Sequence, residues 1–187
     1  MKKLVRFLLL FLPLFASQTL MAQRYAVSTN AADYFNLCTI NAEASFACAK
    51  QWTLTAGFRY NPFQFNRQKT GREFQNKTRT VAIGARYWPW HVYSGWWLSG
   101  NIQYQEYNAG GILSRTTREG DRYGGSLGFG YNRMLGRHFN LDLGLKIWAG
   151  MDRYREYECP VCGLTVDRGN RFFLLPDEIL IAFSYVF

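Results

Sequence analysis

Residues 138–150 read His-Phe-Asn-Leu-Asp-Leu-Gly-Leu-Lys-Ile-Trp-Ala-Gly, and this stretch decides the fold. Every second residue from Phe139 to Ala149 is apolar, and the residues between them are mostly polar or glycine. Successive side chains of a β-strand point to opposite faces, so this alternation predicts a strand with one apolar and one polar face.

The same period of two recurs along the rest of the chain. The other segments that show it, the first of them weakly, are residues 25–30, 38–48, 52–61, 80–87, 96–105, 122–132 and 179–187. A tilted strand needs about 9–11 residues to cross the hydrocarbon core of a membrane, which is close to the length of most of these segments. The sequence therefore predicts an all-β protein, an eight-stranded antiparallel up-and-down barrel.

Two features favour a transmembrane barrel over a soluble sandwich or barrel. Aromatic residues stand at both ends of several apolar faces, as in the pairs Trp52 and Tyr60, Trp96 and Tyr104, and Tyr123 and Tyr131; such aromatic girdles mark the two membrane interfaces. The opposite faces carry charges that an apolar interior would not accommodate unpaired. We expect a charge network inside the barrel, made by Glu43, Arg59, Arg86, Asp142 and Lys146.

The N-terminus has the features of a secretory signal peptide. Lys2, Lys3 and Arg6 precede an apolar run that is too short to span a bilayer, and Ala22 offers a cleavage site. Residues 1–22 are therefore expected to be the signal peptide and 23–187 a single barrel domain. Without the three N-terminal charges the basic count falls from 22 to 19 against 13 acidic residues, so the charge does not indicate nucleic acid as a partner.

The lengths of the connections predict which end of the barrel faces the periplasm. Residues 49–51, 88–95 and 132–137 predict short turns, whereas 62–76, 108–120 and 153–177 predict long loops. Outer-membrane barrels have short periplasmic turns and longer external loops, so both termini are expected in the periplasm. The last strand ends in Phe183, Tyr185 and Phe187, the form of insertion signal that barrel-assembly machinery reads.

The chain also resembles an uncharacterised family of small outer-membrane proteins from Bacteroides-type bacteria, a domain of unknown function. The segments that carry the resemblance are Tyr60-Asn61-Pro62, Ala85-Arg86-Tyr87-Trp88, residues 108–112, Gly128-Phe129-Gly130-Tyr131 and, most specifically, Tyr157-Glu158-Cys159-Pro160-Val161-Cys162-Gly163. The resemblance implies a barrel in the outer membrane and no catalytic residue. Because some members are thought to be encoded near fimbrial assembly genes, it also implies a fimbrial or other envelope protein as a partner.

Cys159 and Cys162 form a CxxC motif in the last predicted loop. Zinc or iron normally takes four ligands, and the sequence offers no second such pair, so we expect no resident cofactor. A local disulfide in an oxidising compartment, a pair of free thiols and a zinc or iron site remain alternatives. Cys38 and Cys48 are interpreted as small apolar residues on a lipid-facing strand.

The predicted external loops are basic. Their candidate phosphate contacts are Arg67, Lys69, Arg72, Arg115, Arg118, Arg168 and Arg171, and Lys77, Arg153 and Arg155 add to the charge. Guanidinium groups suit phosphates, so lipopolysaccharide is an expected partner beside the other outer-membrane lipids; a plain solvated loop surface is the alternative.

No catalytic residue is predicted. Ser114 and Ser126 are available as nucleophiles, but no histidine lies on the external side to act as a base. The expected function is therefore a non-enzymatic outer-membrane barrel that presents basic loops to lipopolysaccharide or to an envelope partner. A lipid A-modifying enzyme and a narrow channel are the alternatives.

Overall fold

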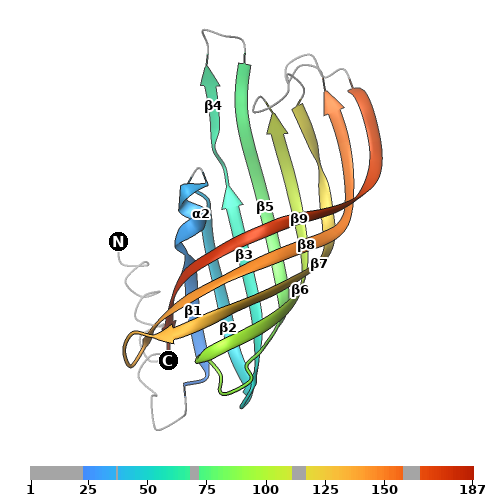
Figure 1. The fold of residues 1–187 in the computed structure, drawn as a ribbon. Coiled ribbons are helices and arrows are strands. Elements are labelled where there is room, and N and C mark those ends of the chain that lie inside the picture. The colour runs from blue at the N-terminus through green and yellow to red at the C-terminus, as the bar shows by residue number, and fades with distance from the viewer. Residues whose placement is uncertain (1–22, 37, 68–71, 111–116, 158–164) are drawn as a thin grey trace, which may run out of the picture.

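A computed structural model describes residues 23–36, 38–67, 72–110, 117–157 and 165–187, and within them one antiparallel sheet closes into a ring (Figure 1). Its elements are β1 (Tyr25–Asn30), α2 (Ala31–Phe35), β2 (Ile40–Ala49), β3 (Trp52–Asn61), β4 (Gln64–Arg67), β5 (Arg72–Tyr87), β6 (Gly95–Gly110), β7 (Thr117–Met134), β8 (Phe139–Tyr157) and β9 (Thr165–Val186). Strands β3 and β4 both pair with β5 and form one interrupted strand, so eight strands complete the ring in this described part. The predicted all-β, up-and-down antiparallel arrangement of eight strands is confirmed.

The two ends of the ring differ. The terminal end carries Arg24, the C-terminal Phe187 and three tight connections, and Arg24 N–H donates to the Phe187 carbonyl over 3.1 Å. At the far end, β4 and the ends of β5 to β9 continue past β1, β2 and β3 as an open sheet, here called the far-end sheet (Figure 1).

The prediction of three long loops was wrong in extent. Residues 72–76, 108–110, 117–120, 153–157 and 165–177 are strand, and they pair with their neighbours, with two bulges along β8 and β9. The reason is that the two faces of these segments are alike, mostly polar on both but apolar on both in residues 172–175, so the alternation that identifies a strand in the ring disappears.

The wall of the ring is shortest at β1. Beyond the end of this strand, the Asn30 side chain and a short helix lie where the strand would have continued. Asn30 Nδ2 donates to the Ile179 carbonyl over 3.0 Å, and Ile181 N–H donates to Asn30 Oδ1 over 2.9 Å. The same Asn30 side chain accepts from Ala32 N–H and so caps α2. Among the described residues no helix is long and apolar enough to span a membrane.

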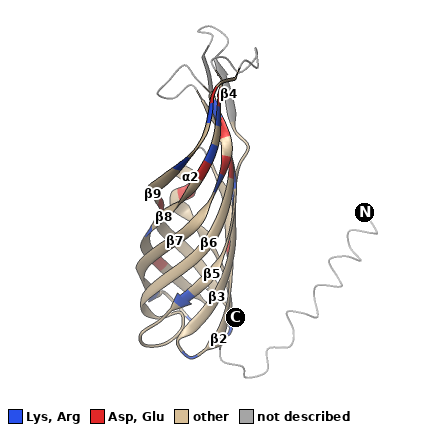
Figure 2. Cartoon of the chain, turned by 90° about the vertical axis from the view of Figure 1, so that its right-hand side faces the viewer, with Lys and Arg blue, Asp and Glu red and all other residues tan. Residues whose placement is uncertain are grey.

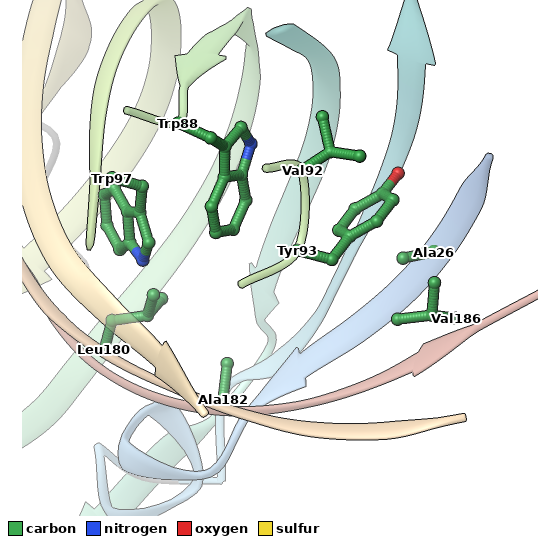
Figure 3. Packing of buried hydrophobic residues seen from close by; sticks show 8 residues of the cluster. All are labelled: Ala26, Trp88, Val92, Tyr93, Trp97, Leu180, Ala182 and Val186. Carbon is green, nitrogen blue, oxygen red and sulfur yellow. The ribbon is translucent and has the colours of Figure 1, made fainter. Parts of the chain in front are cut away.

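The β5–β6 connection closes the terminal end from inside. Val92 and Tyr93 turn back into the ring, where they lie beside Trp88, Ala26 and Val186 (Figure 3). Tyr93 has the unusual φ of 62°, and its carbonyl accepts from Asn140 Nδ2 over 2.9 Å. This group, here called the terminal plug, belongs to a cluster of buried apolar side chains that also includes Trp97, Leu180 and Ala182.

Trp97 extends the plug toward the centre across two glycines. Register places Trp97, Gly130, Gly144 and Leu180 in one row on the interior face. A Cβ at Gly130 or Gly144 would overlap the indole ring of Trp97. The two glycines therefore make room for the tryptophan, in the alternation of large and small residues that fills a small closed sheet.

Replacing Gly130 by valine should lower the free energy of unfolding by about 1–3 kcal/mol, because the new side chain overpacks against Trp97. The matched control is Gly125→Val on the same strand, whose added Cβ would meet only a carbonyl oxygen at 3.7 Å; we expect a change within about 0.5 kcal/mol there. Urea unfolding followed by tryptophan fluorescence measures both, and equal losses would show that the row does not limit residue size.

The outward face of the ring is apolar. Its exposed side chains include Val27, Leu54, Ile83, Leu98, Ile102, Leu127, Phe129, Leu145, Ile147, Ile179, Ile181 and Phe183. Near the terminal end aromatic rings lie side by side on neighbouring strands, with ring centroids 5.1–5.2 Å apart, in the pairs Tyr25 and Phe46, Trp52 and Tyr87, Trp96 and Tyr131, and Phe139 and Tyr185. Figure 2 shows charged residues gathered toward the far end.

Candidate functional site

The interior at mid-height is built around Arg86 of β5. Its guanidinium lies 2.6 Å from Asp142 Oδ2 and 2.8 Å from Glu43 Oε1, and these carboxylates come from strands on other sides of the ring. Trp97 contacts both members of the Arg86–Asp142 pair. Its ring centroid is 4.3 Å from Arg86 Cζ, and its indole N–H donates to Asp142. Arg86, Asp142 and Glu43 thus each have an opposite charge beside them.

Three further ion pairs complete this level. Lys146 Nζ lies 2.9 Å from Glu178 Oε2 and 3.5 Å from Glu43 Oε2, and Arg59 lies 2.7 Å from Asp177 Oδ1. The structure therefore places all five predicted charges, Glu43, Arg59, Arg86, Asp142 and Lys146, inside the ring and in contact with carboxylates or cations. We call them, with Asp177 and Glu178, the mid-height network.

Sequence reasoning missed Asp177 and Glu178 because a bulge brings both side chains inward. Lys146 pairs with Glu178 and Ile147 pairs with Pro176, which leaves Asp177 as an extra residue on β9. A bulge of this kind locally redirects side chains. In the sequence, Pro-Asp-Glu breaks the alternation and is typical of a turn, so the last strand was predicted to start only at Ile179.

The mid-height network leaves little free space. The cavity among Asn41, Arg59, Asn101, Lys146 and their neighbours measures about 40 Å³. That is room for a few water molecules. The arrangement can hold the strands of the ring together and can hydrate its charges, but a solute larger than water does not fit in the cavity.

A second charged group lies nearer the far end and centres on Asp152, which is fully buried. Tyr107 O–H donates to it over 2.8 Å, Arg171 Nε donates over 2.9 Å, and Arg122 Nε lies 3.5 Å away. Arg122 also stacks over the Tyr107 ring, with 3.9 Å between Cζ and the centroid. The sequence did not identify Asp152, because the predicted strand ended at Gly150 and the predicted loop began only at residue 153.

The far-end sheet carries its own polar pairs. Arg118 donates to Glu156 over 2.6 Å, and this hydrogen bond raises the pKa of Arg118. Tyr154 donates to Asp167 over 3.0 Å and Tyr157 donates to Glu119 over 2.6 Å. Each carboxylate raises the pKa of the tyrosine that donates to it, so both hydroxyls stay protonated at neutral pH.

The predicted phosphate contacts fall into three groups. Arg118 and Arg171 lie on strands β7 and β9 rather than in loops, and each holds a carboxylate, Glu156 and Asp152 respectively. Arg168 is exposed on β9. The side chains of Arg67 and Arg72, and the whole of Lys69 and Arg115, lie outside the described residues.

Arg168 and two other arginines stand out because of their register. On the outer face of the far-end sheet Arg155 of β8 lies directly opposite Arg168 of β9, and Arg153 is two residues along. Like charges opposite each other across a sheet are destabilising. Arg153, Arg155 and Arg168 are called the basic rim from here on. On its β7 side, Asp121 and Glu119 lie opposite Arg153 and Arg155, so the repulsion that an added anion would relieve is that between Arg155 and Arg168.

The basic rim borders an open recess of about 1080 Å³. One side of this recess is lined by residues 168–170 of β9, and the other by residues 60–62 and by 77–79 of β5. Its acidic residues already have partners: Asp121 accepts from Tyr104, Glu119 accepts from Tyr157, and Glu106 faces Arg79 at 4.0 Å. The recess therefore has the arginines of the basic rim on one margin and Lys77 and Arg79 on the other.

The cysteines do not build a site in the described part of the chain. Cys159 and Cys162 lie outside it, and no group of three or more histidine, cysteine or acidic residues within it could hold a metal ion. Cys48 is exposed on β2, whereas Cys38 precedes that strand and has φ 54°, so the prediction that Cys38 lies on the strand was wrong. A left-handed residue in the connection from α2 ends the alternation there.

The chain was compared with known proteins. A family model described as "Protein of unknown function (DUF3575)" matches residues 7–187. No curated protein and no solved structure matches the chain significantly. The description assigns no activity, ligand or partner.

Proposed function

The chain belongs to the DUF3575 family, and we propose that it is a non-enzymatic outer-membrane barrel that holds lipopolysaccharide phosphates at its basic rim. The observation that carries the proposal is the inverted distribution of side chains around the ring. The outward face is apolar and exposed, whereas the interior is filled by ion pairs. In water such a surface would drive association; in a bilayer it meets hydrocarbon.

Individual exposures support this reading. Ile102 and Leu127 are 78% and 74% exposed although each lies in the middle of a long strand. The aromatic pairs near the terminal end supply one girdle, and Tyr60, Tyr104 and Tyr123 on the same outward face supply the other. The ring between these girdles then corresponds to the hydrocarbon core.

The difference between the two ends supports one orientation of the barrel in the membrane. The terminal end has only tight connections, which suit the periplasm, and the far end extends into a polar sheet, which suits the outside. On this orientation Phe183, Tyr185 and Phe187 present their rings on the outward face at the periplasmic end of the last strand. Residues 1–22, the proposed signal peptide, lie outside the described residues.

The filled interior favours this proposal over a narrow channel. The terminal plug closes one end and the mid-height network occupies the centre. Ser126, considered above as a nucleophile, is buried inside the ring and accepts a hydrogen bond from Asn101 Nδ2 at 3.3 Å. That position is separated from the proposed lipid surface by the wall of the barrel, which argues against a lipid-modifying reaction there.

The basic rim suits phosphate. Arg153, Arg155 and Arg168 project on the outer face just beyond the far-end aromatic girdle, where lipopolysaccharide head groups would lie. A guanidinium can donate two parallel hydrogen bonds to a phosphate. A phosphate between Arg155 and Arg168 would replace like-charge repulsion by two charge-assisted contacts.

Replacing both Arg153 and Arg155 by alanine should weaken lipid A retention about tenfold, since each charge-assisted contact contributes roughly 1 kcal/mol or more. Purification from outer membranes in mild detergent, followed by mass spectrometry of bound lipid A, measures the change. The matched control is Arg133→Ala with Arg137→Ala, two exposed arginines at the terminal end. Equal lipid A on all three proteins contradicts binding at the rim, and release of the wild type from membranes by alkaline carbonate contradicts the barrel itself.

A further inference from the structure

One long backbone edge of the sheet has no partner in the described part of the chain. Strand β9 pairs with β8 along its whole length, but it pairs with β1 only from Ala182 to Val186. Next to that seam, the Asn30 side chain bonds the backbone of Ile179 and Ile181. From Arg168 to Leu175 no described residue pairs with the outer edge, although β4 and β9 border the same far-end sheet (Figure 1).

The backbone groups that face this edge can be identified from the register. Near the C-terminus the even residues face β8, because Val186 N–H donates to the His138 carbonyl. The extra residue in the bulge reverses the parity, so beyond Pro176 the even residues 168, 170, 172 and 174 face away from β8. Pro176 fits this assignment, since proline on a strand is tolerated where its missing N–H would face an open edge.

The side chains on this stretch are graded from charged to apolar. Arg168 and Asn170 lie at its N-terminal end, and Phe172 and Leu174 lie at its C-terminal end. All four are on the outer face and exposed. An exposed edge with large apolar residues is a template for pairing with another strand. The recess of about 1080 Å³ is lined by residues 168–170, at the charged end of this stretch, so side chains on the inner face of an added strand would have space there.

We propose that an extended segment of a second protein, apolar in its N-terminal half and acidic in its C-terminal half, adds antiparallel to β9 between Arg168 and Leu175. Its apolar residues then lie beside Phe172 and Leu174, and its acidic residues lie beside Arg168, one strand away from Arg153 and Arg155 of the basic rim. Backbone hydrogen bonds give affinity in this mode of recognition, and alternate side chains give specificity.

A second copy of the chain does not fit the edge in this way. Two identical antiparallel edges are related by a two-fold axis perpendicular to the sheet. For a barrel in a membrane that axis lies in the membrane plane, so one copy would be inserted upside down. The exclusion of a second copy rests on the proposed function. The occupant of the edge is then an extended segment of a different polypeptide.

The test uses the full-length protein purified in detergent and two fluorescein-labelled peptides of eight residues. In the first, valine and leucine alternate with threonine in the N-terminal half and glutamate alternates with threonine in the C-terminal half. In the second, the two halves are exchanged, so that composition is constant. We expect the first peptide to bind, by fluorescence anisotropy, about tenfold more tightly than the second, because only its charges match the edge.

Substitutions on β9 separate edge pairing from adsorption. Asn170→Pro removes one edge-facing N–H and leaves the bonds to β8 in place, so affinity for the first peptide should fall about tenfold; Asn170→Ala keeps that N–H and should bind within about twofold. Arg168→Glu should weaken binding of the first peptide and should leave circular dichroism unchanged. No binding, equal binding of the two peptides, or full binding by Asn170→Pro overturns the proposal. Because the assay needs no membrane, none of these results bears on lipopolysaccharide binding or membrane insertion.

Discussion

Replacing Arg86 by alanine should lower the free energy of unfolding by about 3–5 kcal/mol, the cost of leaving buried charges without their partner. The side chains of Arg86 and Asp142 are only 6% and 5% exposed, so water cannot replace the lost guanidinium. Asp142 would keep its hydrogen bond from Trp97, but Glu43 would keep only Lys146 at 3.5 Å. Urea unfolding of the protein in phosphatidylcholine bilayers measures the loss.

The control for this prediction lies on the same strand. Arg79 also faces a glutamate, Glu106, at 4.0 Å, but the two side chains are 70% and 52% exposed. An exposed pair of this kind contributes about 0–1 kcal/mol, so Arg79→Ala should be close to neutral. If Arg86→Ala cost no more than Arg79→Ala, the mid-height network would not be what holds the ring together.

Leu127→Arg is expected to have the second largest effect, and it discriminates between lipid and water around the ring. Leu127 lies on the outward face midway along β7. In a bilayer an arginine there should destabilise the protein by about 2–4 kcal/mol, because its charge enters the hydrocarbon core. On a strand surrounded by water the same change should stay within about 0.5 kcal/mol.

The matched position for Leu127 is Leu135, which is exposed in the β7–β8 turn at the terminal end. An arginine at an interface costs about 0–1 kcal/mol, so Leu135→Arg should be tolerated in the same bilayers. A loss at Leu127 no larger than that at Leu135 would mean that the apolar outward face does not contact lipid hydrocarbon.

The ring itself could be predicted because its two faces meet different surroundings. Residues such as Leu143 and Lys146 differ in polarity with a period of two, so strands, face assignment and the five interior charges all follow from one pattern. The pattern fails wherever the two faces become alike. For that reason the far-end sheet was assigned to loops, and Asp152, just past the predicted end of its strand, was not identified.

Two other features escaped prediction for local reasons. Val92 and Tyr93 lie in a connection without periodicity, and nothing in their sequence distinguishes a turn folded into the ring from one pointing into solvent. Asp177 and Glu178 depend on a single extra residue in β9, which changes the faces of all preceding residues on that strand. Both features arise from tertiary contacts, and these carry no short-range sequence pattern.

The seam between β1 and β9 has a consequence for the order of assembly. All other neighbours in the ring are consecutive in the sequence, so they can form as successive hairpins with short loops to close. At the seam Asn30 meets Ile181, 151 residues away, and this contact carries the largest entropy cost of loop closure. The plug residues Val92 and Tyr93 belong to the β5–β6 hairpin, which can form before the ring closes. They are therefore in place when β9 pairs with β1. Loss of the final residues should therefore leave the earlier hairpins paired but the ring open between β1 and β9.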